Sequence, residues 1–478
     1  MVELIRRAKG NAVFRNVVWL GMGEVVSRLF LFALLIAIAR VLGVHGYGMF
    51  AFGLSVASLV LVVAQFGIHA IFVRDATQDQ KWEHAFPAFL TLSILSGLGG
   101  FLAMAGAAFF LSKETSIHVL FLFLGGYVAA MTVLEMMYAF FRAREEMRYE
   151  AVLKVLQAVL TVSLGAILLL LAPTSANVGL AYAGGAASAL LVMIWIFWFR
   201  TRSIDLQISL PLFKTVLSRT WPLGLAGVFA VVYNSIDSVM LGALGQVAAV
   251  GWYNAAYRIV GAALIPAVFL GHSFLPALSK RLGSSIGSLQ NLWERQVEVA
   301  LMLGVPASVG GAIMAPRIIR ALYPPEFDPA ILALQILIWT VALTFFVSAC
   351  SYMLLVAGQQ TKSLWIVGMG AAGNVLLNMW LIPLWSLYGA AVATLATYVF
   401  LFFLYAEVTR RYTPARLFTS SLGKVLLAVG GGTGIMVAVL TAAAPFPFLL
   451  LLSLGGGVYL VSYGVIRRML FGVFLPAV

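Results

Sequence analysis

The chain has 478 residues, of which 62% are hydrophobic and 10% are charged, and its mean hydropathy is +1.02. Soluble domains carry about 25% charged residues, so this composition excludes a water-soluble fold for a chain of this length. The formal net charge is +13. The single cysteine, Cys350, excludes an intrachain disulfide framework and a cysteine-rich zinc site. Apolar runs of roughly 20 residues predict an all-α integral membrane protein rather than a β-barrel.

About fourteen membrane-spanning helices are predicted in chain order. The opening "MVELIRRAKGNAVFR" is basic like a signal peptide, but the apolar run after it is too long and lacks a clean cleavage site, so we expect a retained first helix. Most connections are short, which makes neighbouring helices antiparallel. The predicted spans are 14–40, 47–73, 86–111, 117–141, 151–172, 177–199, 219–243, 250–277, 297–321, 331–357, 361–383, 387–407, 422–442 and 446–466.

The placement of positive charge predicts the orientation of these spans. Of the 30 Lys and Arg residues, 24 fall on one side of the predicted membrane, and two, Arg28 and Arg258, fall within spans. The remaining four are Arg40, Lys113, Arg317 and Arg320. The positive-inside rule then places both termini in the cytoplasm, and we expect the cell inner membrane as the location. Because most of the positive charge sets topology in this way, nucleic acid is not an expected partner.

An internal repeat divides the chain. "GYGMFAFGLSV" after the first span aligns with "AVGWYNAAYRI" after the seventh, so that Gly48 matches Gly251 and His69 matches His272. Six spans separate the two repeat starts, and the repeats therefore enter the membrane in the same direction. We expect two six-helix lobes around a central cavity, followed by two extra helices. The predicted parts are an N-lobe at 1–200 (helices 1–6), a C-lobe at 201–410 (helices 7–12) and helices 13–14 at 411–478.

Three segments carry a resemblance to a known family. They are "SRLFLFALLIAIARVLGVHGYGMFAFG", "SVMLGALGQVAAVGWYNAAYRIV" and "GNVLLNMWLIPLWSLYGAAVATLATY", and their order and spacing extend from about residue 10 to 410. The chain resembles the oligosaccharide flippases of the multidrug/oligosaccharidyl-lipid/polysaccharide exporter superfamily, which are related to the lipid II flippase. The resemblance to that relative includes Arg28 and Arg40, but Leu34 stands where it has a further basic residue. This departure argues against a peptidoglycan precursor as the substrate.

The resemblance implies a transported substrate and its partners. The implied substrate is a polyprenyl-diphosphate-linked oligosaccharide, which would be moved from the cytoplasmic to the outer leaflet of the lipid bilayer by alternating access. A glycan polymerase or export machinery would be a partner. The chain has no phosphate-binding loop for ATP, so an ion gradient (H+ or Na+) or the membrane potential is the expected drive. No cofactor is expected.

Charged residues inside the spans are the candidate site. Arginine keeps its charge in a membrane and offers a planar set of donors for phosphate oxygens, so Arg28, Arg258 and Arg40 are assigned to the diphosphate. Glu24 lies four residues before Arg28, on the same helical face, where it either neutralises Arg28 or acts as a coupling carboxylate. Asp237 and Arg258 have matching depths on adjacent predicted helices, which predicts a buried ion pair or a switch.

Other polar residues are open to two interpretations. His69 and His272 either couple transport to protons or lie at helix ends near water. Glu135 is a second candidate coupling carboxylate. Asn374 and Asn378 are expected to hydrogen-bond neighbouring helices rather than substrate. The mixed-charge stretch 140–149 is expected to be solvated.

Nothing in the sequence supports catalysis, and no metal site is expected. His and Cys are too few and too scattered for metal ligands, and no nucleophile and base have a reason to lie together. The first alternative is a multidrug/cation antiporter of the same superfamily, which would favour an acidic or aromatic cavity. The second alternative is a membrane polysaccharide polymerase or glycosyltransferase, which the short, plain loops disfavour.

Overall fold

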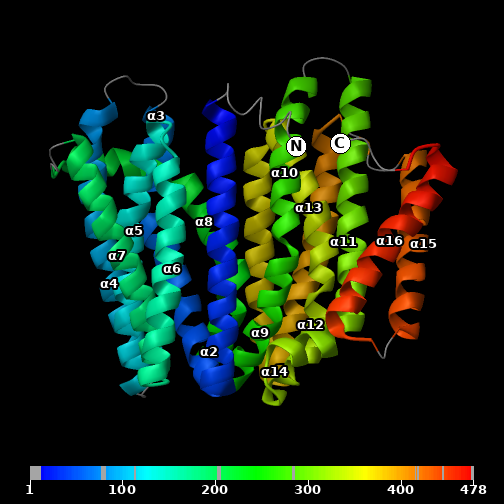
Figure 1. Ribbon diagram of the computed structural model, residues 1–478. Helices are drawn as coiled ribbons and strands as arrows, with labels where there is room; N and C mark the ends of the chain where they lie inside the picture. The colour runs from blue at the N-terminus through cyan, green and yellow to red at the C-terminus, as the bar shows by residue number, and fades with distance from the viewer. Residues whose placement is uncertain are drawn as a thin grey trace. The chain divides into compact units, whose positions relative to one another are not determined.

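The computed structural model describes residues 12–76, 82–111, 115–201, 206–282, 286–414, 416, 419–443 and 446–474. Within these ranges the chain is all-helical, with no strand (Figure 1). In a bilayer a helix satisfies its backbone hydrogen bonds internally, so apolar runs of this length fold as helices. The elements are α2 (Ala12–Gln65), α3 (Ile68–Ala76), η1 (Trp82–Ala85), α4 (Phe86–Leu111), α5 (Thr115–Ala143), α6 (Arg148–Leu171), α7 (Ser175–Thr201), α8 (Leu210–Ala243), α9 (Val247–Ala263), α10 (Ile265–Leu282), α11 (Ile286–Leu322), η2 (Pro325–Phe327), α12 (Ala330–Leu337), α13 (Trp339–Val356), α14 (Gln360–Tyr412), α15 (Ser420–Ala442) and α16 (Phe448–Phe471).

Twelve helical segments in the described ranges are long and apolar enough to cross a membrane, which confirms a multi-pass membrane protein. Two of them contain a residue with non-helical backbone angles, Gly43 (φ 67°) in α2 and Ser386 (φ 50°) in α14. A straight helix as long as α2 would extend about 80 Å, far more than the roughly 30 Å of hydrocarbon in a bilayer. The expected number of fourteen spans requires each of these two helices to cross twice, and it stays a prediction.

The chain forms two compact units, Met1–Gly251 and Trp252–Val478. In the first unit α5 packs against α4 and α7, α6 packs against α2 and α7, and α8 packs against α2. The predicted N-lobe ends at 200, before α8, so the compact unit extends beyond it. The lobes inferred from the repeat stay a prediction.

The core of the first unit is aromatic at one end and tightly packed along its helices. Phe86 lies with its ring centroid 4.6 Å from that of Phe140 and 5.2 Å from that of Phe197. Between α6 and α7 the approach is so close that a Cβ added to Gly185 would lie 2.0 Å from Oγ1 of Thr161. Small residues at such contacts let membrane helices approach closely, so this packing fixes the relative positions of α6 and α7.

In the second unit, α11 is the helix that most others contact. It packs against α10, α12, α13, α15 and α16, and α13 also packs against α14. α15 and α16 form a hairpin whose buried apolar residues, together with Met314 of α11, make one core cluster. The two last helices are therefore packed into this unit through α11.

Three predicted spans are each broken into two helices. The span predicted at 47–73 divides between α2 and α3. The span predicted at 250–277 divides at Leu264, just before Pro266, whose ring has no N–H to continue the helical hydrogen bonding. The span predicted at 331–357 divides at Ile338. There Ser308 of α11 donates to the Ile338 carbonyl (2.9 Å) and accepts from the Ala342 N–H (3.1 Å). A side chain inserted between these two backbone groups breaks the helix at that point.

Candidate functional site

Six charged side chains form a connected network inside the first unit. We call it the charge network: Glu135 and Arg142 of α5, Glu150 and Lys154 of α6, and Glu24 and Arg28 of α2. Three carboxylates and three cations alternate along it, so the formal charges cancel. Burying an ion is costly unless it is paired, and this alternation pairs every member.

The most buried part of the network is centred on Arg142. Its Nε and Nη2 donate to the two oxygens of Glu150 at 2.6 and 2.7 Å, and Nη2 also donates to Glu135. Glu150 is only 2% exposed. It lies in the first turn of α6, where the helix dipole favours a carboxylate. A two-point arginine–carboxylate contact of this kind orients both groups firmly.

Lys154 connects this buried part to α2. Its Nζ lies 3.0 Å from Glu150 and 3.3 Å from Glu24. Glu24 in turn accepts from Nε of Arg28 at 2.8 Å, so the ion pair expected from their spacing is present. The exposed fraction rises from 2% at Glu150 to 28% at Lys154 and 55% at Arg28. The network therefore runs from a buried end to an accessible arginine.

The guanidinium of Arg28 has hydrogen-bond donors that no described residue uses. Within the described part of the chain its Nε is the only nitrogen of the guanidinium that donates, which leaves both terminal NH2 groups available. Two NH2 groups in one plane suit two oxygens of a phosphate. The accessible end of the network can therefore make a first contact with an anion through these NH2 groups while Nε still donates to Glu24.

Some members of this network were candidates from the sequence, and others were missed. Glu24, Arg28 and Glu135 were candidates, and the structure brings all three into one network. His69 of α3 lies within electrostatic reach of Glu135, Arg142 and Glu150. The expectation that 140–149 is solvated was wrong for Arg142, because α5 and α6 pack so that it faces two carboxylates. Glu150 and Lys154 were missed, although opposite charges four residues apart at the start of a membrane helix were a usable signal.

The other predicted residues lie apart from the network. Arg40 is exposed on α2, shortly before the kink, and Asp237 of α8 is 1% exposed. Arg258 of α9 has a buried Nε with no hydrogen-bond partner in the described ranges. Asp237 and Arg258 belong to different compact units, so their pairing stays a prediction. The side chain of His272 lies outside the described residues.

The two asparagines form hydrogen bonds within α14. Asn378 donates to Asn374 at 3.0 Å, and Asn374 donates to Thr397 beyond the kink of α14 at 3.3 Å. Both asparagines are fully buried. Among the described residues no group of three or more His, Cys, Asp or Glu is suited to a metal ion.

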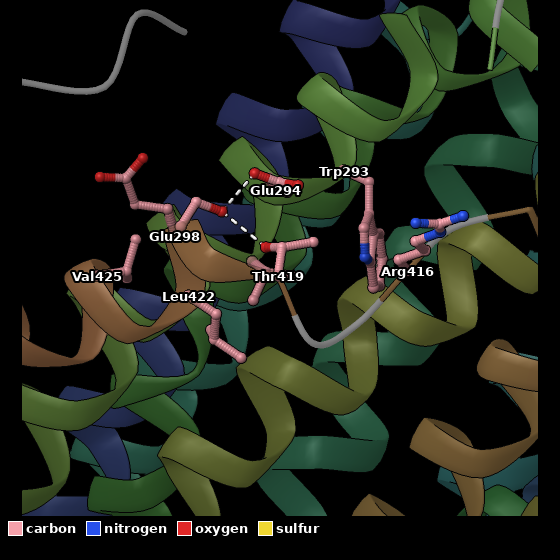
Figure 2. A pocket seen from close by; sticks show the side chains of 9 residues that line it. Trp293, Glu294, Glu298, Arg416, Thr419, Leu422 and Val425 are labelled. Atoms are coloured by element: carbon pink, nitrogen blue, oxygen red, sulfur yellow. Dashed lines mark hydrogen bonds between the residues drawn. The ribbon is translucent and has the colours of Figure 1, made fainter. Parts of the chain in front are cut away.

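A polar pocket lies in the second unit, between α11 and the segment that leads into α15. Figure 2 shows Trp293 and Arg416 on one side of it and Glu298 and Val425 on the other. Ser421 donates to Glu294, and Gln290 donates to the Arg416 carbonyl at 2.9 Å. Because the lining side chains of Glu294 and Ser421 are paired with each other, we assign the pocket a role in packing rather than in binding.

A buried ion pair next to the pocket joins α16 to α11. Arg467 donates to both oxygens of Glu298, and Tyr463 donates to the same carboxylate at 2.8 Å. The side chains of Arg467 and Glu298 are 9% and 7% exposed. Arg467 also donates to the Val473 carbonyl at 3.0 Å. The Arg467–Glu298 ion pair therefore links the C-terminal hairpin to α11 of the second unit.

Solved structures of known proteins share this fold. A lipid II flippase MurJ in an inward closed conformation matches with a TM-score of 0.79 and 13% sequence identity, covering 95% of this chain and 99% of that one. An inward-facing multidrug resistance MATE family transporter of the MOP superfamily matches with a TM-score of 0.67 and 16% identity, covering 80% and 93%. The fold is therefore that of the multi-pass MurJ and MATE transporters.

Sequence comparison gives the family. The chain belongs to the polysaccharide biosynthesis protein family, whose profile matches residues 13–281. It is also 24% identical over 392 residues to the probable flippase AglR of Haloferax volcanii, an alignment that covers 79% of each chain. The predicted likeness to flippases is confirmed.

Proposed function

We propose that the protein is a flippase that moves a polyprenyl-diphosphate-linked oligosaccharide from the cytoplasmic to the outer leaflet by alternating access. It would reside in the cell inner membrane with both termini in the cytoplasm. An H+ or Na+ gradient or the membrane potential would drive it. Family membership and the likeness to AglR and MurJ support this class of transport, which is not enzymatic.

The observation that carries the proposal is the accessible guanidinium of Arg28. A cation in a membrane helix is costly and marks a functional position. Glu24 contacts only its Nε, so its two terminal NH2 groups are available for a diphosphate. Arg258, whose Nε has no hydrogen-bond partner in the described ranges, and Arg40 are the further cations we assign to this headgroup.

Coupling to an ion requires groups that change charge. We assign this role to Glu24, Glu135 and His69, which lie in or beside the charge network, and to Asp237 and His272. Carboxylates and histidines are the membrane side chains that commonly take up and release protons. A glycan polymerase or export machinery would receive the product.

Reconstituted vesicles test the proposal. A fluorescent polyprenyl-diphosphate-linked oligosaccharide is placed in one leaflet, and its arrival in the other is followed by access to a membrane-impermeant lectin. We expect protein-dependent transfer, and at least roughly tenfold slower transfer by Arg28→Gln, since a charge-assisted phosphate contact is lost.

The matched control for this experiment is Arg219→Gln. Arg219 is 57% exposed, close to the 55% of Arg28, and its ion pair with Asp75 is long at 3.7 Å. We expect this variant to transfer at the wild-type rate. Absence of transfer with a range of glycans would overturn the flippase assignment. Protein-dependent efflux of a cationic dye in the same vesicles would favour the antiporter, whose fold the chain shares.

A further inference from the structure

Glu24 has two cationic partners that come from different helices. Nε of Arg28, four residues later on α2, lies 2.8 Å from Oε1, and Nζ of Lys154 on α6 lies 3.3 Å from Oε2. Each cation therefore contacts its own oxygen of the carboxylate. The carboxylate stays paired when one of the two cations leaves.

Arg28 cannot bind a diphosphate fully while Glu24 holds it. The Glu24 carboxylate occupies the Nε donor of the guanidinium, and its negative charge repels that of the phosphate. Releasing Arg28 in a chain with no other partner for Glu24 would leave an unpaired carboxylate inside the membrane, which is strongly unfavourable. The release is feasible only if a second cation neutralises Glu24.

Lys154 is placed to be that second cation. Its other partner, Glu150, already accepts two hydrogen bonds from Arg142, at 2.6 and 2.7 Å. Lys154 can therefore move toward Glu24 without leaving Glu150 unpaired. Lysine carries its charge on a long flexible stem, which suits a contact that shifts between two carboxylates.

We propose that Lys154 is a positioning residue. It becomes the ion-pair partner of Glu24, and Arg28 then exchanges this carboxylate for the diphosphate of the substrate. Lys154 itself does not touch the substrate. The exchange rests on the proposed function, because it explains how Arg28 becomes available to the headgroup. It also gives a reason for three carboxylates near a site that binds an anion.

Binding of farnesyl diphosphate to the detergent-purified full chain, measured by titration calorimetry, tests the exchange. We expect Lys154→Met to bind about tenfold more weakly, since Glu24 then keeps Arg28 and a charge-assisted hydrogen bond is weakened. Lys154→Arg should bind within about threefold of wild type. The double variant Glu24→Gln/Lys154→Met should return to within about threefold as well, because the competing carboxylate is gone and the formal charges again cancel.

Two controls separate the exchange from a loss of folding. Lys214→Met makes the same change at an exposed position of α8 and should bind like wild type. Glu24→Gln alone keeps Lys154 and should bind at least as tightly as wild type, since nothing then competes for Arg28. A merely structural role for Lys154 predicts no rescue by the second substitution.

The exchange is overturned if the double variant binds as weakly as Lys154→Met, if Lys154→Met binds like wild type, or if wild type does not bind farnesyl diphosphate. It is also overturned if Glu24→Gln binds more than threefold more weakly than wild type. A failure of the proposed function would give a different set of results from a failure of the exchange. In that case the expected binding pattern is seen, but the vesicles show no transfer of any linked oligosaccharide.

Discussion

At the scale of single residues, the charge network shows which contacts local spacing predicts and which it does not. The Glu24–Arg28 pair follows from a separation of four residues on one helix. The contact of Arg142 with Glu135 spans seven residues within α5, whereas its contact with Glu150 spans eight residues and crosses from α5 to α6. The contact between Arg142 and Glu150 exists because the turn between these helices folds back tightly, which no charge pattern along the chain specifies.

The buried position of Arg142 leads to a prediction about stability. Arg142→Met removes the cation that Glu135 and Glu150 share, which leaves Glu150 with Lys154 alone. We expect the free energy of unfolding in detergent, measured by denaturant titration, to fall by about 3 kcal/mol. Arg144→Met is the matched control, because Arg144 is 40% exposed and its ion pair with Glu83 is 3.8 Å long. That variant should change stability by less than about 0.5 kcal/mol, and equal losses for both variants would contradict a buried network.

At the scale of helices, hydropathy predicts apolar cores better than polar ends. The span predicted at 86–111 coincides with α4, whereas α8 and α11 begin nine and eleven residues before their predicted starts at 219 and 297. Their extra turns carry polar residues such as Lys214 and Glu294, which lower the hydropathy without breaking the helix. The break at Ile338 was missed because Ser308 of another helix causes it.

The inserted hydroxyl of Ser308 gives a prediction at the same scale. Ser308→Ala removes a fully buried group that satisfies both the Ile338 carbonyl and the Ala342 N–H. We expect a loss of about 1–3 kcal/mol in the free energy of unfolding, the cost of leaving buried backbone groups unpaired. Ser273→Ala, which removes an exposed hydroxyl bonded within its own helix, should have little effect. If Ser308→Ala is as stable as wild type, the two short helices join into one without strain.

At the scale of the whole molecule, the distribution of charge predicts orientation, and the orientation can be tested by labelling. Cys350 is the single cysteine of the chain, so a Cys350→Ala background carries no native thiol. In it, Thr174→Cys, in the exposed turn between α6 and α7, should react with a membrane-impermeant maleimide in intact cells. Gln360→Cys, exposed at the start of α14, should react only after permeabilisation. The reverse pattern would show that the termini lie outside.

Three segments of the sequence carry the likeness to flippases, while composition and periodicity alone establish an all-helical membrane protein and the approximate helix limits. They do so because a bilayer demands long apolar helices whose length and charge bias can be read locally. The connection of Glu135, Arg142, Glu150 and Lys154 to Glu24 and Arg28 depends on the packing of α2, α5 and α6. The same is true of the fastening of α16 to α11 by Glu298 and Arg467. Contacts between distant helices depend on which faces meet, and that is decided by close packing at residues such as Gly185 rather than by the order of residues along any one helix.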